Sequence, residues 1–162
     1  SLTFTTGNWS NNQTITVTGV NDSLDDGDIT VSQDANGLVL TGSSDADEIT
    51  VVGNVAVTVH GADGADVIDG GDGDDVLRGE AGDDTIDAGR GDDTVEGGDG
   101  DDTILAGRGD DELAGGDGDD VVKGHGGNDR LCGGEGFNQV VGTAAEIDEC
   151  FGDCFEDLCP DV

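Results

Sequence analysis

Nine consecutive nine-residue units run without interruption from Gly61 to Val141. Position 4 of the unit is Gly in all nine, and position 6 is Asp in the first eight and Asn138 in the ninth. A period this short and regular is typical of a solenoid, in which each unit stacks on its neighbours. Position 8 is aliphatic in every unit: Ile68, Leu77, Ile86, Val95, Ile104, Leu113, Val122, Leu131 and Val140.

The two halves of the unit predict different local structure. Positions 1 to 6 are rich in Gly and Asp, which favour tight turns, and we call these six positions the corner. Positions 7 to 9 carry β-branched and aliphatic residues, which favour a short strand with position 8 facing inward. Two units placed back to back enclose a core, so we expect each coil to contain two units, or about 18 residues. Successive coils then pair as parallel strands about 4.8 Å apart.

The apolar strip is too thin to hold such a stack together. Ordering one residue costs about 1 to 2 kcal/mol, whereas burying one Val, Leu or Ile returns about 1.5 to 3 kcal/mol. The repeat block also carries 24 Asp and Glu against five Lys and Arg, a net charge of −19. A hard divalent cation, bound by carboxylates and by backbone carbonyls of the corners, can supply the missing free energy.

The nonapeptide block resembles the hemolysin-type calcium-binding (RTX) repeats of secreted bacterial toxins, proteases and adhesins. The resemblance covers 81 of the 162 residues. It implies an all-β, right-handed parallel β-roll (a β-solenoid) with Ca²⁺ as the cofactor at about seven sites, located outside the cell or on its surface.

The resemblance also implies a ligand set. In that family each ion lies between two corners one coil apart, and both corners contribute their position-6 side chain. The side-chain ligands implied here are Asp66, Asp75, Asp84, Asp93, Asp102, Asp111, Asp120, Asp129 and Asn138. The first corner adds the carbonyls of positions 2 and 4, which are Ala62, Gly64, Gly71, Gly73, Glu80, Gly82, Gly89, Gly91, Gly98, Gly100, Gly107, Gly109, Gly116 and Gly118. The second corner adds those of positions 1 and 3, which are Gly79, Ala81, Ala88, Arg90, Gly97, Asp99, Ala106, Arg108, Gly115, Asp117, Gly124, Gly126, Gly133 and Glu135.

Three departures from a uniform repeat bear on these sites. Asn138 lacks a charge, so the last site is expected to be weak. Glu80 and His125 stand at position 2, where glycine is usual. Arg90 and Arg108 at position 3 are interpreted as local charge balance rather than as a partner site. Position 5 is acidic in six units, and we interpret these residues as solvated and outward-facing rather than as further ligands: Asp74, Asp83, Asp92, Asp101, Asp110 and Asp119.

The segments outside the repeats differ in kind. Residues 1–31 resemble the closing strands of a Calx-β or cadherin-like sandwich module, and 32–60 are predicted to be degenerate coils that form an N-terminal cap with little or no metal. Residues 142–162 are predicted to form a C-terminal cap that includes a short helix. We expect two disulfides, with Cys132 bound to one of the other three cysteines and the connectivity open: Cys150, Cys154 or Cys159.

Composition limits the function classes. A net charge of −34 with 3% aromatic residues argues against nucleic acid and anionic membranes as partners, and favours cations. No stretch is apolar enough to insert in a membrane, and no catalytic motif such as HExxH or GxSxG occurs. Two hypotheses remain: a non-enzymatic calcium-dependent module of a secreted protein, or a C-terminal fragment of a larger RTX toxin, adhesin or enzyme. No protein partner can be named from either.

Overall fold

The computed structural model describes residues 14–16, 29–32, 37–142 and 147–148, with side chains for residues 37–142. These residues form short strands joined by tight turns, and no helix occurs among them. The strands are β1 (Thr14–Thr16), β2 (Ile29–Ser32), β3 (Leu38–Thr41), β4 (Glu48–Val52), β5 (Val57–Asp63), β6 (Val67–Asp69), β7 (Val76–Ala81), β8 (Thr85–Arg90), β9 (Thr94–Asp99), β10 (Thr103–Arg108), β11 (Glu112–Asp117), β12 (Val121–Gly126), β13 (Arg130–Glu135), β14 (Gln139–Val141) and β15 (Ile147–Asp148).

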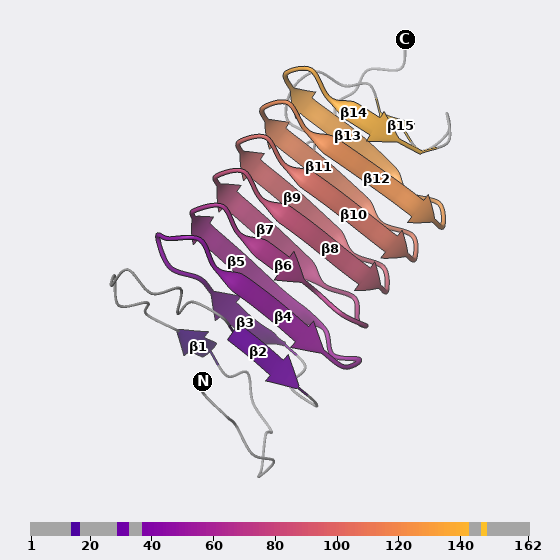
Figure 1. Ribbon diagram of the computed structural model, residues 1–162. Coiled ribbons are helices and arrows are strands. Elements are labelled where there is room, and N and C mark those ends of the chain that lie inside the picture. The colour runs from indigo at the N-terminus through magenta and orange to yellow at the C-terminus, as the bar shows by residue number, and fades with distance from the viewer. Residues whose placement is uncertain (1–13, 17–28, 33–36, 143–146, 149–162) are drawn as a thin grey trace.

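The strands alternate between two parallel sheets that face each other along the stack (Figure 1). Sheet A has the order β1-β3-β5-β7-β9-β11-β13-β15, and sheet B has the order β14-β12-β10-β8-β6-β4-β2. Within the repeats each residue pairs with its equivalent two units further along, as Ile86 does with Ile104. Nearer the N-terminus the coils are slightly longer, since Leu38 pairs with Val57 and Ile29 pairs with Ile49. The predicted all-β parallel solenoid, with two units in each repeat coil, is confirmed.

The core lies between the sheets, and its main part in the repeats is one aliphatic side chain from each strand. The position-8 residues of the first eight units are at most 1% exposed, and Val140 of the ninth packs against them half-buried. Ala88 and Ala106, at position 1, join the same cluster. The prediction that position 8 points inward is confirmed. The N-terminal coils contribute a thicker apolar layer, made of Leu38, Leu40, Ile49, Val51, Val55, Val57 and Val59.

The corners keep one shape even where position 2 is not glycine. Ala62, Glu80 and His125 have φ values of 87°, 79° and 71°. This left-handed conformation costs a residue with a Cβ about 1 to 2 kcal/mol. Glu80 nevertheless stays in register with Gly98 of the next coil. The stacking of the coils therefore overrides the local preference at these positions.

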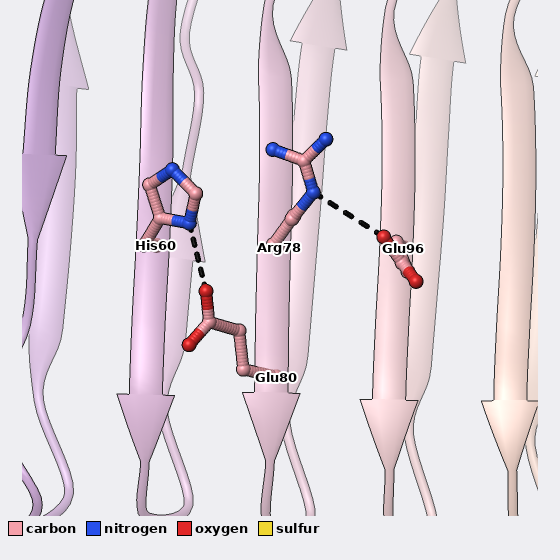
Figure 2. A network of polar contacts seen from close by, with 4 residues as sticks. All are labelled: His60, Arg78, Glu80 and Glu96. Carbon is pink, nitrogen blue, oxygen red and sulfur yellow. Dashed lines mark hydrogen bonds and ion pairs between the residues drawn. The ribbon is translucent and has the colours of Figure 1, made fainter.

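The Glu80 side chain turns onto the outer face of sheet A (Figure 2). Its Oε1 lies 2.7 Å from Nδ1 of His60, and beside this pair Arg78 Nε lies 3.3 Å from Glu96 Oε2. Both pairs are partly exposed to solvent, where an ion pair contributes little to stability. The Glu80 side chain therefore leaves the corner, and the Glu80 backbone, with its carbonyl, remains in it.

The predictions for the segments before and after the repeats concern many residues that lie outside the described ones. Strands β3 and β4 continue the two sheets of the repeats, and β1 and β2 extend them further. Ile147 and Asp148, expected in a short helix, instead pair with β13 as a strand, because the open edge of sheet A offers them hydrogen-bonding partners. The sandwich resemblance of residues 1–31, both caps and the segment boundaries stay predictions.

None of the described residues forms a helix long and apolar enough to cross a membrane.

Candidate metal sites at the corners

Each corner buries the carboxylate of its position-6 aspartate. The eight aspartates from Asp66 to Asp129 are between 1% and 5% exposed, and Asn138 is half-buried. Position 6 lies at the end of the turn that precedes each strand. It is two residues before position 8, which faces inward. A buried carboxylate is costly unless hydrogen bonds or a cation compensate it. The corners therefore require partners for both carboxylate oxygens.

One oxygen of each side chain has a backbone partner in the preceding coil. Asp102 Oδ1 accepts the N–H of Asp84 at 2.8 Å, and Asp84 Oδ1 accepts the N–H of Asp66 at 2.7 Å. The same bond recurs up to Asn138, whose Oδ1 accepts the N–H of Asp120 at 2.8 Å. Position 6 thus forms a hydrogen-bonded ladder along both edges of the roll.

The second oxygen has no protein partner in seven of these residues. Among the described side chains, the buried oxygens without a hydrogen bond are Oδ2 of Asp66, Asp75, Asp84, Asp93, Asp102, Asp111 and Asp120. These seven are the residues that have a repeat corner one coil later, so each faces a corner that can complete a two-corner site. A row of buried carboxylate oxygens without hydrogen bonds indicates where a cation can bind.

The surroundings of Oδ2 are built from backbone oxygen. A Cβ added at Gly70 would lie 2.9 Å from Asp75 Oδ2 and 2.8 Å from the carbonyl oxygen of Ala88, one coil later. The carboxylate oxygen and this position-1 carbonyl therefore lie close to the same point. The pattern recurs at Gly79, where a Cβ would contact Asp84 Oδ2 and the carbonyl of Gly97. Hard oxygen ligands from side chain and backbone are those that Ca²⁺ prefers.

Burial raises the pKa values of these carboxyls. Desolvation is the main cause at each, opposed by the bond from the N–H one coil earlier and assisted by neighbouring carboxylates. It raises the pKa of Asp93 and Asp102 to about 7, and that of Asp66, Asp75 and Asp111 to about 6. The pKa values of Asp84 and Asp120 are also raised. Without a cation, these corners hold a proton more readily than an ordinary aspartate does.

The predicted carbonyl ligands differ in how free they are. Position-3 carbonyls already accept one N–H from the preceding coil, as Asp99 O does from Gly82 N at 2.8 Å. A carbonyl oxygen has a second lone pair, so this bond does not exclude an ion. The described residues hold no group of three or more His, Cys, Asp or Glu side chains around one point. The full two-corner ligand set stays a prediction.

At both ends of the position-6 columns, the two polar atoms of the side chain have protein partners. The N-terminal end is Asp47, the sixth residue of the degenerate unit 42–50. Asn138 Nδ2 donates to the carbonyl of Gly134 at 3.1 Å, where an aspartate would present Oδ2. Asp47, in the N-terminal coil, accepts the Ser43 N–H on Oδ2 at 2.5 Å and the Ser43 hydroxyl on Oδ1 at 3.3 Å. The role of Ser43 was not predicted, although a serine as the second residue of the degenerate unit 42–50 was the available signal.

Position 5 departs from the expected solvated turn. All six position-5 aspartates are exposed, as predicted, yet each accepts a backbone N–H from the next coil. Of the two position-3 arginines, Arg90 lies with its Nε 3.8 Å from Asp72 Oδ1. That distance fits the predicted charge balance.

Replacing Asp102 by Asn is expected to weaken calcium binding less than replacing it by Ala. Asn keeps the Oδ1 acceptor for the Asp84 N–H but loses the charge, as Asn138 does, whereas Ala loses both. Equilibrium dialysis should show roughly one or two fewer ions per chain for either variant, because such a carboxylate can serve ions on both sides. The calcium midpoint should be higher for Ala than for Asn.

The matched control is Asp87→Asn, which removes the same charge from the exposed outer face of sheet B. It should bind as many ions as the wild type. If Asp87→Asn and Asp102→Asn lowered the number of ions equally, position 6 would not be the ligand column.

Comparison with known proteins agrees with the geometry of the corners. No curated protein and no solved structure matches the chain significantly. The family model for the RTX calcium-binding nonapeptide repeat matches residues 60–95, 79–113 and 105–140, which together span half of the chain. That stretch contains the seven unpartnered carboxylate oxygens. The chain belongs to the RTX calcium-binding nonapeptide repeat family, and its β-roll is a calcium-binding structural module.

Proposed function

We propose that this chain is the calcium-dependent structural module of a secreted protein, folding when it meets Ca²⁺ outside the cell. The observation that supports this most directly is the row of seven buried Oδ2 atoms without a protein partner. Each would gain an ionic partner from a bound cation. Because the ions would bridge successive coils, binding and folding would be one process.

Calcium suits these corners better than magnesium. At the five of these corners that begin with glycine, a backbone carbonyl of the next coil lies near Oδ2. Its position follows from the coil spacing rather than from octahedral geometry. Ca²⁺ accepts six to eight oxygens in irregular arrangements, whereas Mg²⁺ demands near-ideal octahedral coordination and retains its waters. We therefore infer about seven Ca²⁺ sites, with the weakest at the Asn138 end.

An extracellular role follows from the charge and the supply of calcium. A repeat block with a net charge of −19 and a thin core stays expanded where calcium is scarce. Extracellular modules bind Ca²⁺ at about 10⁻⁴ to 10⁻³ M, so this block would fold only after export. Such a module would be non-enzymatic, with no nucleic-acid partner and no membrane insertion. In a larger toxin, adhesin or enzyme it would be the calcium-binding part, with the activity elsewhere.

Equilibrium dialysis against Ca²⁺ tests this proposal. About seven ions per chain should bind cooperatively near millimolar concentration, and the same concentration of Mg²⁺ should bind much less. Binding of only one or two ions would contradict folding through the repeated corners. Equal binding of Mg²⁺ would contradict the carbonyl-rich ligand set.

A further inference from the structure

The position-5 carboxylates are exposed but have fixed partners. In each case Oδ1 accepts the backbone N–H of the position-5 residue one coil later. The bonds are Asp92 N to Asp74 at 3.0 Å, Asp101 N to Asp83 at 3.0 Å, Asp110 N to Asp92 at 2.9 Å, Asp119 N to Asp101 at 2.9 Å, Asn128 N to Asp110 at 2.9 Å and Phe137 N to Asp119 at 2.9 Å. Six such bonds form a second ladder along the edges of the roll.

This second ladder runs in the opposite direction to the first. Asp101 accepts from Asp119 in the following coil, whereas its neighbour Asp102 accepts from Asp84 in the preceding coil. In the six corners that have both carboxylates, the two side chains therefore tie the corner to both of its neighbours. The inner carboxylate also carries the unpartnered Oδ2, while the outer one is exposed to solvent.

Along the position-5 column, aspartate occurs where its side chain accepts the N–H of the next coil. Aspartate occupies position 5 in units two to seven, each of which is followed by a further repeat coil. The last two units carry Asn128 and Phe137, and they act through their backbone N–H as donors. Phe137 is 91% exposed and its side chain has no acceptor, yet its N–H still bonds to Asp119. Apart from Ala65 in the first unit, position 5 thus carries an aspartate wherever a following repeat coil supplies a backbone N–H to it.

A merely solvated charge does not account for this arrangement. Residues in equivalent positions of adjacent coils lie about 4.8 Å apart, so a column of exposed aspartates places like charges beside one another, which is unfavourable. A hydrogen bond from a backbone N–H to a carboxylate is stronger than one to a neutral group. That bond offers a reason for aspartate here despite the repulsion.

We infer that the position-5 aspartates are positioning residues for the proposed calcium sites. They hold successive corners at a fixed spacing through the ladder of N–H bonds and do not bind the ion. The calcium part of this inference rests on the proposed function, whereas the coil-to-coil clamp stands on the hydrogen bonds alone. Position 5 would then contribute to calcium affinity through geometry, and position 6 through coordination.

The test compares Asp101→Ala with Asp101→Asn, since Asn retains an Oδ1 acceptor without the charge. Asp87→Ala removes an equal charge from the outer face of sheet B and is the control. At saturating Ca²⁺, urea unfolding of Asp101→Ala should show an unfolding equilibrium constant about two- to tenfold higher than wild type, as expected for one lost hydrogen bond. Asp101→Asn should return most of the way to wild type.

Two further readouts separate the clamp from other roles. Hydrogen exchange of the Asp119 amide should be accelerated in Asp101→Ala and remain near wild type in Asp101→Asn. The number of bound Ca²⁺ ions should be unchanged in both variants, although the calcium midpoint of Asp101→Ala should rise.

Each contrary result points to a different error. Equal effects of Asn and Ala, or effects no larger than that of Asp87→Ala, would reduce position 5 to a solvated charge and overturn the inference. The loss of one ion per chain would make Asp101 a ligand and also overturn it. If wild type failed to bind Ca²⁺ while Asp119 exchange still responded to Asp101→Ala, the proposed function would fail and the clamp would stand.

Discussion

Calcium-free protein at neutral pH is expected to lose the sheet structure of residues 61–141. In the folded roll, seven carboxylate oxygens would then be buried without a cation or a hydrogen bond. An unsatisfied buried polar group costs about 1 to 3 kcal/mol, and more when charged. The combined cost of seven such groups is comparable to or larger than the whole stability of a typical folded domain, about 5 to 15 kcal/mol. Circular dichroism in excess chelator at pH 7.5 should show mainly unfolded chain.

Returning Ca²⁺ should restore the β signal in a steep transition, because each ion would join two corners and each corner would serve ions in both neighbouring coils. The matched control is Mg²⁺ at the same concentration and ionic strength, which should restore little. An undiminished β signal in excess chelator would show that the core and the backbone ladders suffice without metal.

Acid is expected to replace part of the calcium requirement. The pKa of Asp93 and Asp102 is about 7 in the folded chain, and that of Asp66, Asp75 and Asp111 is about 6, against 3.8 for an unperturbed aspartate. Between pH 3.8 and about 7 the folded chain therefore binds more protons than the unfolded chain. The free energy of unfolding of the calcium-free protein falls as the pH rises through this window. The stabilisation is fully present below pH 3.8 and is lost by about pH 7.

A shift of two pKa units corresponds to about 3 kcal/mol for a single carboxyl, so several of them should produce a large effect. Lowering the pH from 7.5 to about 5 in chelator should raise the β signal, followed by circular dichroism. In the presence of Ca²⁺ the sign reverses, because protons compete with the ion for the same oxygens. The calcium midpoint should therefore rise as the pH falls.

Two controls separate protonation of the corners from a general reduction of charge. Screening with about 1 M KCl at pH 7.5 weakens exposed repulsion but does not protonate a buried group, so it should restore little structure. The calcium-free double variant Asp93→Asn/Asp102→Asn should retain structure to higher pH than the wild type, because it lacks the two carboxyls with the highest pKa. If salt worked as well as acid, exposed charge would be the main obstacle to folding.

Sequence alone determined the architecture of this chain. Each unit supplies one inward-facing aliphatic residue, at position 8, so two units must face each other to enclose a core. The pairing of Ile86 with Ile104, two units apart, agrees with this arrangement. The residues alone predicted a cation bound by carboxylates, and the assignment of the position-6 aspartates as its ligands came from the resemblance to RTX repeats. The structure adds that these aspartates are buried.

The sequence placed Asp101 outward and Asp102 among the ligands, but only the tertiary structure showed which backbone N–H each carboxylate accepts. Asp101 and Asp102 are chemically identical, and the sequence offers no reason for one carboxylate to accept from the following coil and the other from the preceding coil. Their directions depend on the backbone conformation of the corner and on which N–H groups the neighbouring coil brings within reach. The same reason explains why the closure of Asp47 by Ser43 and the left-handed Glu80 were not foreseen. The sequence determines which residues share a corner, whereas the stacking of the coils decides which atoms of that corner remain for an ion.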